Sequence, residues 1–307
     1  MKKKTIFVAI FLLVFSNIGA IFSFRYYQKY QEANKQRLIY KARKAAWQDL
    51  EQRINAEISR FKGEVGIVVK DLGSGWKFSH NKNKLFPPAS LAKIPLMAAC
   101  FRASEEGRIK LDRNVALKSA DKLTGSGALK EMESGAIFSI EELIGLMIYD
   151  SDNTASNMLT NIVGIDYLNN SFKAFGLKNT ILSRKIADFS ARDNGVENYT
   201  TAEDMASLLG KIYHRNLVNK GVSEHCIKLM KLSRVNDRIP KYLPADITIV
   251  HKTGLERGIC HDAGIVFNCK GDFLIVVLTK HTNSNSSPAK EFIARVALLV
   301  YKYFEQL

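Results

Sequence analysis

Residues 86–97 read FPPASLAKIPLM and place Ser90 three positions before Lys93, at the start of an apolar segment. Helical residues three apart lie on one face about one turn apart, so the Lys93 amine can reach the Ser90 hydroxyl. A helix that is apolar nearly all round is buried. A buried lysine needs a partner or a lowered pKa, because its charge is costly away from water. The stretch therefore predicts a nucleophile beside a base, and an exposed helix start with a solvated lysine is the alternative.

The Ser-x-x-Lys spacing is common in this chain, so the spacing alone decides nothing. It begins at six serines, namely Ser59, Ser74, Ser79, Ser90, Ser119 and Ser287. Two tripeptides lie downstream of Ser90. Ser151-Asp152-Asn153 follows an apolar segment over residues 140–149, and Lys252-Thr253-Gly254 ends an expected strand over residues 247–251. Taken singly, the first is typical of a helix N-cap and the second of a turn.

The sequence predicts an α/β (α+β) fold with one five-stranded, mostly antiparallel sheet. Helices expected over residues 26–62 and from Ser287 to the end would cover the sheet, with Ser287 as N-cap and Pro288 in the first turn. The middle of the chain, predominantly helical to about residue 243, would form an inserted helical lobe. A cleft between the lobes is the natural binding site. The strands are expected over residues 65–69, 76–78, 247–250, 264–267 and 273–278.

The charge of +15 is concentrated at the start of the 307-residue chain. Residues 1–44 hold ten Lys or Arg against one Glu. Residues 5–24 are uncharged, mostly apolar and long enough to cross a bilayer, so we expect residues 1–24 to be an uncleaved anchor or, alternatively, a signal segment. Residues 25–45 are expected to be a basic helical stalk and residues 46–307 one globular domain. A basic cluster beside an apolar segment favours anionic lipid headgroups as partners, and no nucleic-acid motif is present.

Four cysteines show no disulfide-framework spacing, so we expect buried free thiols. Cys260 and Cys269 fall at the two ends of one expected strand, about 30 Å apart, too far for a disulfide. None of the cysteines forms a metal-ligand cluster with the six histidines. We therefore expect neither a metal nor a cofactor.

Together and in this order, the three motifs resemble the signature of class A β-lactamases and penicillin-binding proteins, Ser-x-x-Lys, Ser-Asp-Asn and Lys-Thr-Gly. The separations, 61 residues from Ser90 to Ser151 and 101 from Ser151 to Lys252, are similar to those of class A β-lactamases. The resemblance covers about residues 47–307. It implies a β-lactamase/transpeptidase-like serine hydrolase that acts on β-lactams or on peptidoglycan stem peptides.

The resemblance also implies catalytic roles. Ser90 would attack an amide or lactam carbonyl to form an acyl-enzyme, and Lys93 would take the Ser90 proton. Ser151 would relay a proton to the departing nitrogen, assisted by Lys252. Two lysines close together lower each other's pKa, which makes a neutral lysine base possible near pH 7.

Substrate-binding roles follow from the same resemblance. Asn153 would hold the substrate's side-chain amide. Lys252 and Thr253 would bind the substrate carboxylate, and Gly254 would be a further substrate-binding residue. The backbone N–H groups of Ser90 and Leu255 would form the oxyanion hole, where losing one donor typically costs about 10²–10³ in rate.

The sequence departs from class A β-lactamases in the loop that would drive deacylation. That family has an Arg followed two residues later by a Glu that activates water, and an Asp-Thr-Thr whose Asp pairs with the Arg. Here Arg184 and Thr200-Thr201 fit, but Ile186 takes the Glu position and Tyr199 the Asp position. General-base catalysis is worth about 10²–10⁴-fold, so we expect slow deacylation, with Asp188 as the nearest carboxylate in sequence. This favours a D-alanyl-peptidase-like enzyme.

Two alternatives stay open. One is an active β-lactamase with a relocated deacylating base, and the other is a non-catalytic, membrane-bound sensor of β-lactams or peptidoglycan. A Ser/His/Asp triad is disfavoured, because no Gly-x-Ser-x-Gly elbow is present and His251 and His261 are as easily strand or turn residues. Counting the flanking charges would place the domain in the cytoplasm, but large domains cross largely regardless of charge. We expect a bacterial cell-membrane protein with its catalytic domain outside.

Overall fold

The computed structural model describes the backbone of residues 2–283 and 285–306, and the side chains of Val8 and of residues from Phe22 onward in those ranges. The contacts divide the chain into two units, one ending at Gln52 and the other running from Arg53 to Gln306. The second unit contains all the strands and the predicted site. The division into anchor, stalk and globular domain remains a prediction.

Helix α1 (Lys2–Arg60) includes the expected stalk, and its side chains over residues 22–46 are mostly exposed. Trp47, Leu50 and Ile54 are buried, as the apolar stripe of this segment predicts. Within the part of the chain that is described, no helix is long and apolar enough to span a bilayer. Most side chains of the expected anchor, residues 5–24, lie outside the described residues, so the anchor also remains a prediction.

The five-stranded sheet is confirmed, with strand order β2-β1-β7-β6-β5 and every pair antiparallel. The central β7 is buried on both faces up to Thr279, which explains its unbroken apolar sequence. Strand β5 is an edge strand, so one side of its backbone is free of sheet pairing. The strands are β1 (Glu64–Asp71), β2 (Lys77–His80), β5 (Thr248–Glu256), β6 (Ile259–Phe267) and β7 (Phe273–Lys280).

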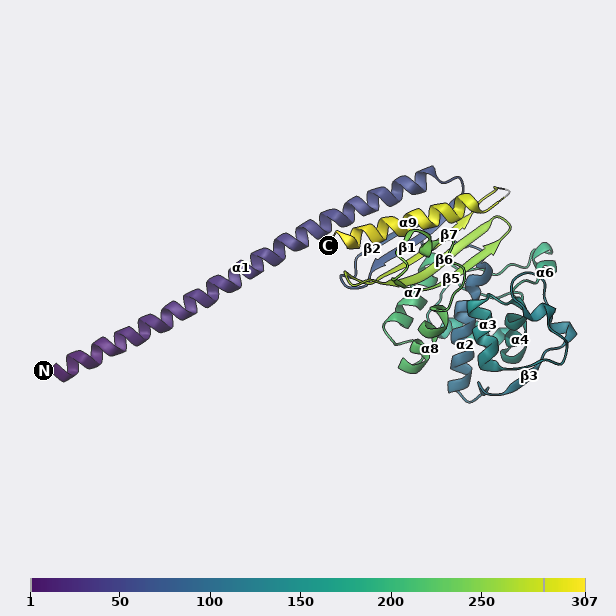
Figure 1. Ribbon diagram of the computed structural model, residues 1–307, viewed down its shortest axis with the longest axis horizontal. Helices are drawn as coiled ribbons and strands as arrows, with labels where there is room; N and C mark the ends of the chain where they lie inside the picture. The colour runs from purple at the N-terminus through teal and green to yellow at the C-terminus, as the bar shows by residue number, and fades with distance from the viewer. Residues whose placement is uncertain (1, 284, 307) are drawn as a thin grey trace. The chain divides into compact units, whose positions relative to one another are not determined.

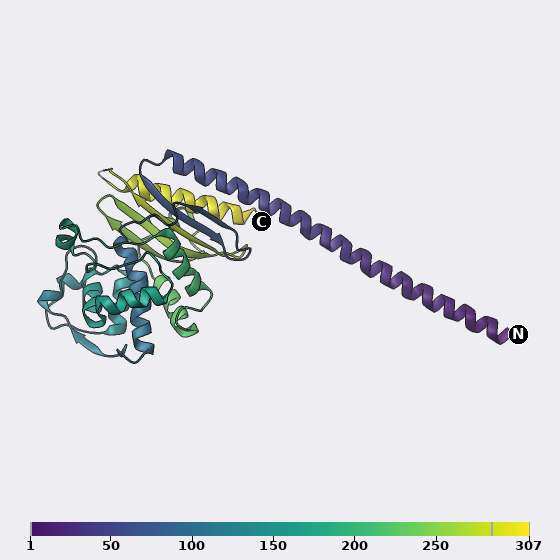
Figure 2. The same cartoon turned by 180° about the vertical axis from the view of Figure 1, so that it is seen from behind.

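Helix α9 (Ser287–Glu305) and the last turns of α1 lie side by side against the sheet in both views (Figures 1 and 2). Glu57 receives a hydrogen bond from Arg295 at 2.8 Å, and the Phe61 ring stacks on Phe292 with centroids 4.7 Å apart. Ser286, rather than Ser287, occupies the N-cap position of α9 and makes no side-chain cap. These contacts lie within the second unit, which includes the last two turns of α1.

The helical lobe follows β2 in the chain, as predicted, and lies below the sheet in Figure 1. Helices α7 and α8 contact the sheet, and α2 packs against α3, α4, α5 and α8. The lobe also holds a two-stranded sheet that the sequence did not predict, because its strands are only three residues long. Its α-helices and strands are α2 (Lys93–Glu105), α3 (Ile140–Tyr149), α4 (Asn153–Val163), α5 (Ile165–Ala174), α6 (Phe189–Asp193), α7 (Ala202–Tyr213), α8 (Lys220–Met230), β3 (Asn114–Ala116) and β4 (Ile137–Ser139). The 3₁₀ helices are η1 (Ala89–Ala92), η2 (Ser119–Asp121), η3 (Leu129–Glu131) and η4 (Ile239–Tyr242).

Two further sequence predictions on this fold are wrong. Strand β5 does not end at residue 251 but continues to Glu256, because it pairs with β6 up to the tight turn at Gly258, which has φ +72°. Lys252-Thr253-Gly254 is therefore part of a strand rather than a turn. The four cysteines are free, and three are buried, but Cys269 is exposed in the connection between β6 and β7.

Candidate active site

Ser90 lies in the 3₁₀ helix η1, directly before α2, and is partly exposed. Residues i and i+3 eclipse in a 3₁₀ helix, so Ser90 and Lys93 stay on one face, although the expected α-helix begins only at Lys93. The preceding Ala89 has φ +46°, a conformation costly for a residue with a Cβ. The chain enters this turn at Pro87, whose carbonyl lies 2.8 Å from His261 Nε2.

Lys93 is fully buried and directs its amine at Ser151 and Asn153. Its Nζ donates to Ser151 O at 2.6 Å, to Asn153 Oδ1 at 2.8 Å and to Ser151 Oγ at 3.3 Å. Among the hydrogen bonds between described residues, none joins Lys93 to the Ser90 hydroxyl. Burial, and then the nearby Lys252 charge, lower the pKa of Lys93 well below its usual value. This shift favours the neutral amine that a base requires.

The Ser151-Asp152-Asn153 tripeptide is both a helix N-terminus and a part of the site. Asp152 is the N-cap of α4 and accepts a hydrogen bond from Ala155 N at 2.8 Å. Asn153 donates through Nδ2 to Thr124 O at 3.0 Å, so both ends of its amide are engaged. Ser151 has φ +55°, which turns the chain sharply between α3 and α4. The helix-cap interpretation and the functional one are compatible.

Lys252 reaches the same hydroxyl from the sheet, with Nζ donating to Ser151 Oγ at 2.9 Å. It is 1% exposed, and burial lowers the pKa of Lys252 to about 7. The nearby Asp262 opposes this shift, and the guanidinium of Arg238 adds to it. Ser151 therefore lies between two buried amines, one from α2 and one from β5.

The other predicted residues follow Lys252 along β5. Thr253 is buried and Leu255 is half exposed. A Cβ at Gly254 would lie 3.1 Å from Pro88 O and 3.3 Å from Ala89 Cβ, so β5 passes close to the turn that carries Ser90. Only glycine permits this approach without displacing η1.

A cavity of about 300 Å³ opens beside Ser90. It brings Ser90, Asn153 and Leu255 together, as the sequence predicts for substrate binding. Its other lining residues are Gly125, Ser126, Ile186, Ala187, Phe189, Arg192, Glu256 and Arg257. Lys93, Ser151 and Lys252 do not line this cavity. Lys93 donates a hydrogen bond to the lining residue Asn153, and the Ser151 hydroxyl accepts from both lysines.

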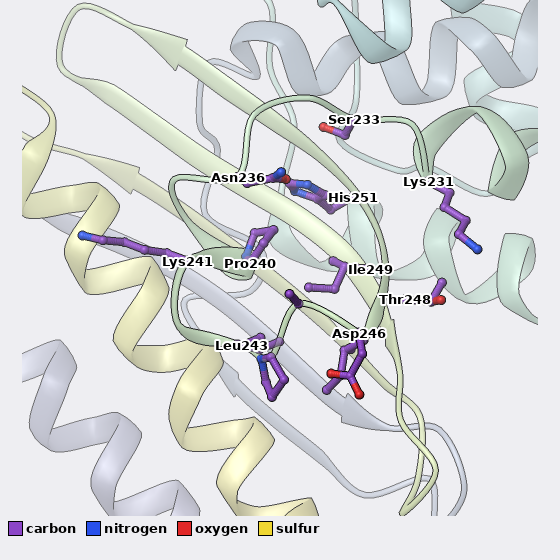
Figure 3. Close-up of a pocket in the computed structure, with 13 residues that line it drawn as sticks. Lys231, Ser233, Asn236, Pro240, Lys241, Leu243, Asp246, Thr248, Ile249 and His251 are labelled. Atoms are coloured by element: carbon purple, nitrogen blue, oxygen red, sulfur yellow. The ribbon is translucent and has the colours of Figure 1, made fainter.

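A larger cavity, of about 600 Å³, lies near the other end of β5 (Figure 3). Its wall is built by the start of β5 and by the segment between α8 and β5. It includes His251, whose Nδ1 lies 2.9 Å from Asp262 Oδ1. It does not include Ser90, so volume alone does not identify the site.

The loop that departs from class A β-lactamases in sequence, residues 184–201, is held by an ion pair. This corrects the prediction that Arg184 has no partner. Arg184 was expected to lack a partner, yet its guanidinium forms an ion pair of 2.7 Å with Glu197. Tyr199 instead forms an isolated bridge with Ile181 and is 37% exposed. The other half of the prediction agrees with the structure, because Ile186 presents an apolar side chain to the cavity beside Ser90.

Sequence reasoning missed several charged groups around the site. Arg192, Glu256 and Arg257 line the cavity, Arg238 affects the pKa of Lys252, and Glu197 pairs with Arg184. Arg238 is 1% exposed and donates from Nε to Cys260 Sγ at 3.2 Å. No sequence signal pointed to Arg238 or Glu197, because both lie in irregular segments. Glu256 could have been found, because strand residues two apart share a face, and 252, 254 and 256 follow that spacing.

This arrangement suits acyl transfer by a serine: an accessible hydroxyl, two buried amines with lowered pKa and a hydroxyl between them. Among the described residues, no cluster of three or more His, Cys, Asp or Glu could hold a metal ion.

The chain is similar in sequence and in fold to beta-lactamases and to PBP-A. A sequence profile of the beta-lactamase enzyme family matches residues 49–304. Beta-lactamase CARB-3 of Pseudomonas aeruginosa is 27% identical over 224 residues, which are 69% of this chain and 75% of CARB-3. A beta-lactamase from Sphaerobacter thermophilus has a TM-score of 0.77 at 27% identity, over 85% of this chain and 98% of its own. PBP-A has a TM-score of 0.78 at 29% identity, over 84% of this chain and 97% of its own.

Proposed function

We propose that this chain, which belongs to the beta-lactamase enzyme family, uses Ser90 to form an acyl-enzyme with β-lactams and with D-alanyl-D-alanine-type amides of peptidoglycan. The observation that carries this is the position of the Ser151 hydroxyl, 2.9 Å from Lys252 Nζ and 3.3 Å from Lys93 Nζ. Two amines with lowered pKa on one hydroxyl form a path along which a proton can move. Such a path is what acylation of a serine requires.

In the proposed acylation, Lys93 removes the Ser90 proton while Oγ attacks the carbonyl carbon. The tetrahedral intermediate collapses when the carbon–nitrogen bond breaks, and the leaving nitrogen takes a proton through Ser151. Lys252 and Thr253 hold the substrate carboxylate, and Asn153 holds its side-chain amide. The backbone N–H groups of Ser90 and Leu255 stabilise the developing oxyanion.

We further propose that release of the acyl group is slow, as in D-alanyl-peptidases. Ile186 offers the cavity no group that can take a proton from water. A missing general base costs about 10²–10⁴-fold in rate. The ion pair of Arg184 with Glu197 supports a fixed loop, so slow release is expected from the absence of a carboxylate at position 186 and not from a loose loop.

A β-lactamase with fast turnover is the second candidate, and one observation favours it: the carboxylate of Glu256 borders the cavity beside Ser90. The family resemblance alone does not separate the two, since the comparisons include both beta-lactamases and PBP-A.

We also propose that residues 1–24 anchor the protein in a bacterial cell membrane with the catalytic domain outside. The basis is the uncharged 20-residue segment after Lys2-Lys3-Lys4. Alkaline extraction of membranes and protease access to intact spheroplasts test this. A protein that is extracted, or one that is protected from protease, contradicts it.

The function itself is tested by labelling with a fluorescent penicillin. Ser90→Ala should abolish covalent labelling, whereas Ser79→Ala, at another Ser-x-x-Lys serine, should label like the wild type. Labelling of Ser90→Ala at the wild-type rate would overturn the assignment. Intact-mass spectrometry of the adduct over time then separates slow release from fast turnover and from the absence of chemistry.

A further inference from the structure

We propose that Glu256 is the general base that activates water to hydrolyse the acyl-enzyme. This rests on the proposed function, because it assigns the second half of the Ser90 reaction. It goes beyond that proposal by placing the base on β5, whereas the family resemblance directs attention to the loop at Ile186.

The direction of the Glu256 side chain follows from strand geometry. Side chains two apart in a strand share a face, so Glu256 lies on the face of Lys252 and Gly254. Lys252 points at Ser151, and Gly254 faces Pro88 and Ala89, the residues just before Ser90. Continuing along this face, Glu256 points to the cavity that Ser90 also lines. Its side chain is 12% exposed.

Burial and the surrounding charges shift the pKa of Glu256. Burial raises its pKa, and Glu197 adds to this, while Arg184, Arg192 and Lys93 oppose it. Glu256 in turn favours the charged form of Lys93, an effect smaller than that of burial or of Lys252. A carboxylate with a raised pKa is better matched to proton transfer near neutral pH than an ordinary one.

The carboxylate of Asp188, the alternative base, caps a helix. Asp188, the candidate nearest in sequence, is the N-cap of α6 and accepts a hydrogen bond from Ala191 N at 3.0 Å. It is not among the residues that line the cavity beside Ser90. Arg192 lies 3.5 Å from Glu256 Oε2, which still leaves lone pairs of Glu256 for a water molecule. The ion pair competes with proton transfer, so release by this base is still expected to be slow.

In the proposed step, water replaces Ser90 Oγ on the acyl carbon. A water molecule in the cavity gives a proton to the Glu256 carboxylate while its oxygen bonds to the ester carbon of the acyl-enzyme. The tetrahedral intermediate collapses, the bond from that carbon to Ser90 Oγ breaks, and Oγ takes the proton that Glu256 received, which regenerates the Glu256 carboxylate. The products are the free acid and the regenerated Ser90 hydroxyl.

The test measures formation and loss of the penicillin adduct separately, by intact-mass spectrometry on the full-length protein. Glu256→Gln should form the adduct at nearly the wild-type rate and lose it about 10²-fold more slowly. Asp188→Asn, which preserves the helix cap, should lose it at the wild-type rate. Adding Ile186→Glu to Glu256→Gln should restore release by supplying a carboxylate from the other wall of the cavity.

A second variant separates a base from a merely structural residue. The rate at which the acyl group is released should fall as pH drops through the pKa of Glu256, because the protonated carboxyl cannot accept a proton. This fall is the low-pH limb of the release rate. Arg192 lowers that pKa, so Arg192→Gln should move this limb to higher pH while Glu256 remains in place. If Arg192→Gln and Glu256→Gln slow release equally with no movement of the limb, Glu256 acts only by holding Arg192, and the proposal is wrong.

The remaining outcomes are also decisive. An adduct that Glu256→Gln loses at the wild-type rate overturns the role of Glu256 and leaves the role of Ser90 intact. A wild-type protein that never forms the adduct overturns both proposals.

Discussion

Arg184 and Glu197 form an ion pair of 2.7 Å in which the arginine side chain is 3% exposed and the glutamate side chain 16%. The pair closes the loop that carries Ile186 and α6. It supplies the contact that the sequence predicted to be missing, from a residue two positions before Tyr199. The loop beside Ser90 therefore has no carboxylate at position 186, but it keeps an ion pair, formed by Arg184 and Glu197.

Breaking this pair should be costly. Glu197→Ala leaves a buried guanidinium without its charged partner, and such changes typically cost about 3–5 kcal/mol in the free energy of unfolding. Urea denaturation measures the effect. Glu224→Ala is the control, because its pair with Lys220 is exposed and should contribute less than about 1 kcal/mol. Equal losses for the two variants would show that the Arg184 pair does not pin the loop.

Lys93 should control acylation through a proton that it can lose. Lys93→Ala and Lys93→Arg should both slow the penicillin burst at neutral pH, because an arginine stays charged and cannot act as a base. In the wild type, the burst should slow as pH falls through the lowered pKa of Lys93. Stopped-flow measurements check both statements, and a wild-type burst rate in Lys93→Arg would contradict the role of Lys93.

Lys252 should affect the pH at which the acylation rate begins to fall. Its charge helps lower the pKa of Lys93, so Lys252→Ala should raise the pKa of Lys93. The low-pH limb of the acylation rate should then move to higher pH, apart from any loss in substrate binding. A limb at the same pH in both proteins would mean that burial alone sets the pKa of Lys93.

Apolar patterning predicted the sheet, because it is a property of the chain itself. The order of the motifs, through the family resemblance, implied that Lys93 and Lys252 would meet at Ser151, and their hydrogen bonds agree with this. The sequence could not predict the turns that place Ser90 and Ser151. Ala89 and Ser151 have positive φ without being glycine, and tertiary packing imposes that conformation against local preference. The ends of β5 were missed for a similar reason, since pairing with β6 extends it to Glu256.

His261 should make stability depend on pH. Its buried ring lies between Pro87 O and the backbone N–H of Thr279, and burial lowers its pKa from 6.5 to about 4. The unfolded chain then binds a proton more readily than the folded one, so stability is lost as pH falls from about 6.5 to 4. The shift corresponds to about 3 kcal/mol. His261→Gln, which can keep both hydrogen bonds, should weaken this dependence in urea titrations, and His214→Gln, at an exposed histidine, should not.

Ile186→Glu should convert slow release into faster turnover. The side chain at this position lines the cavity with Ser90, so a glutamate there can reach a water near the ester. The penicillin burst should keep nearly its wild-type rate, because acylation depends on Lys93, Ser151 and Lys252. Release should rise by up to about 10²-fold, the lower end of what a general base contributes, since Glu256 is a like charge nearby and will raise the pKa of the new carboxyl. Ile186→Gln is the matched control and should not accelerate release, because an amide cannot take the proton.

Adding Tyr199→Asp to Ile186→Glu should bring no further gain in the release rate, since Arg184 already pairs with Glu197. Stopped-flow and steady-state hydrolysis of one penicillin separate burst from release, and a wild-type protein that already turns over many times per second would contradict the premise that Ile186 limits the reaction.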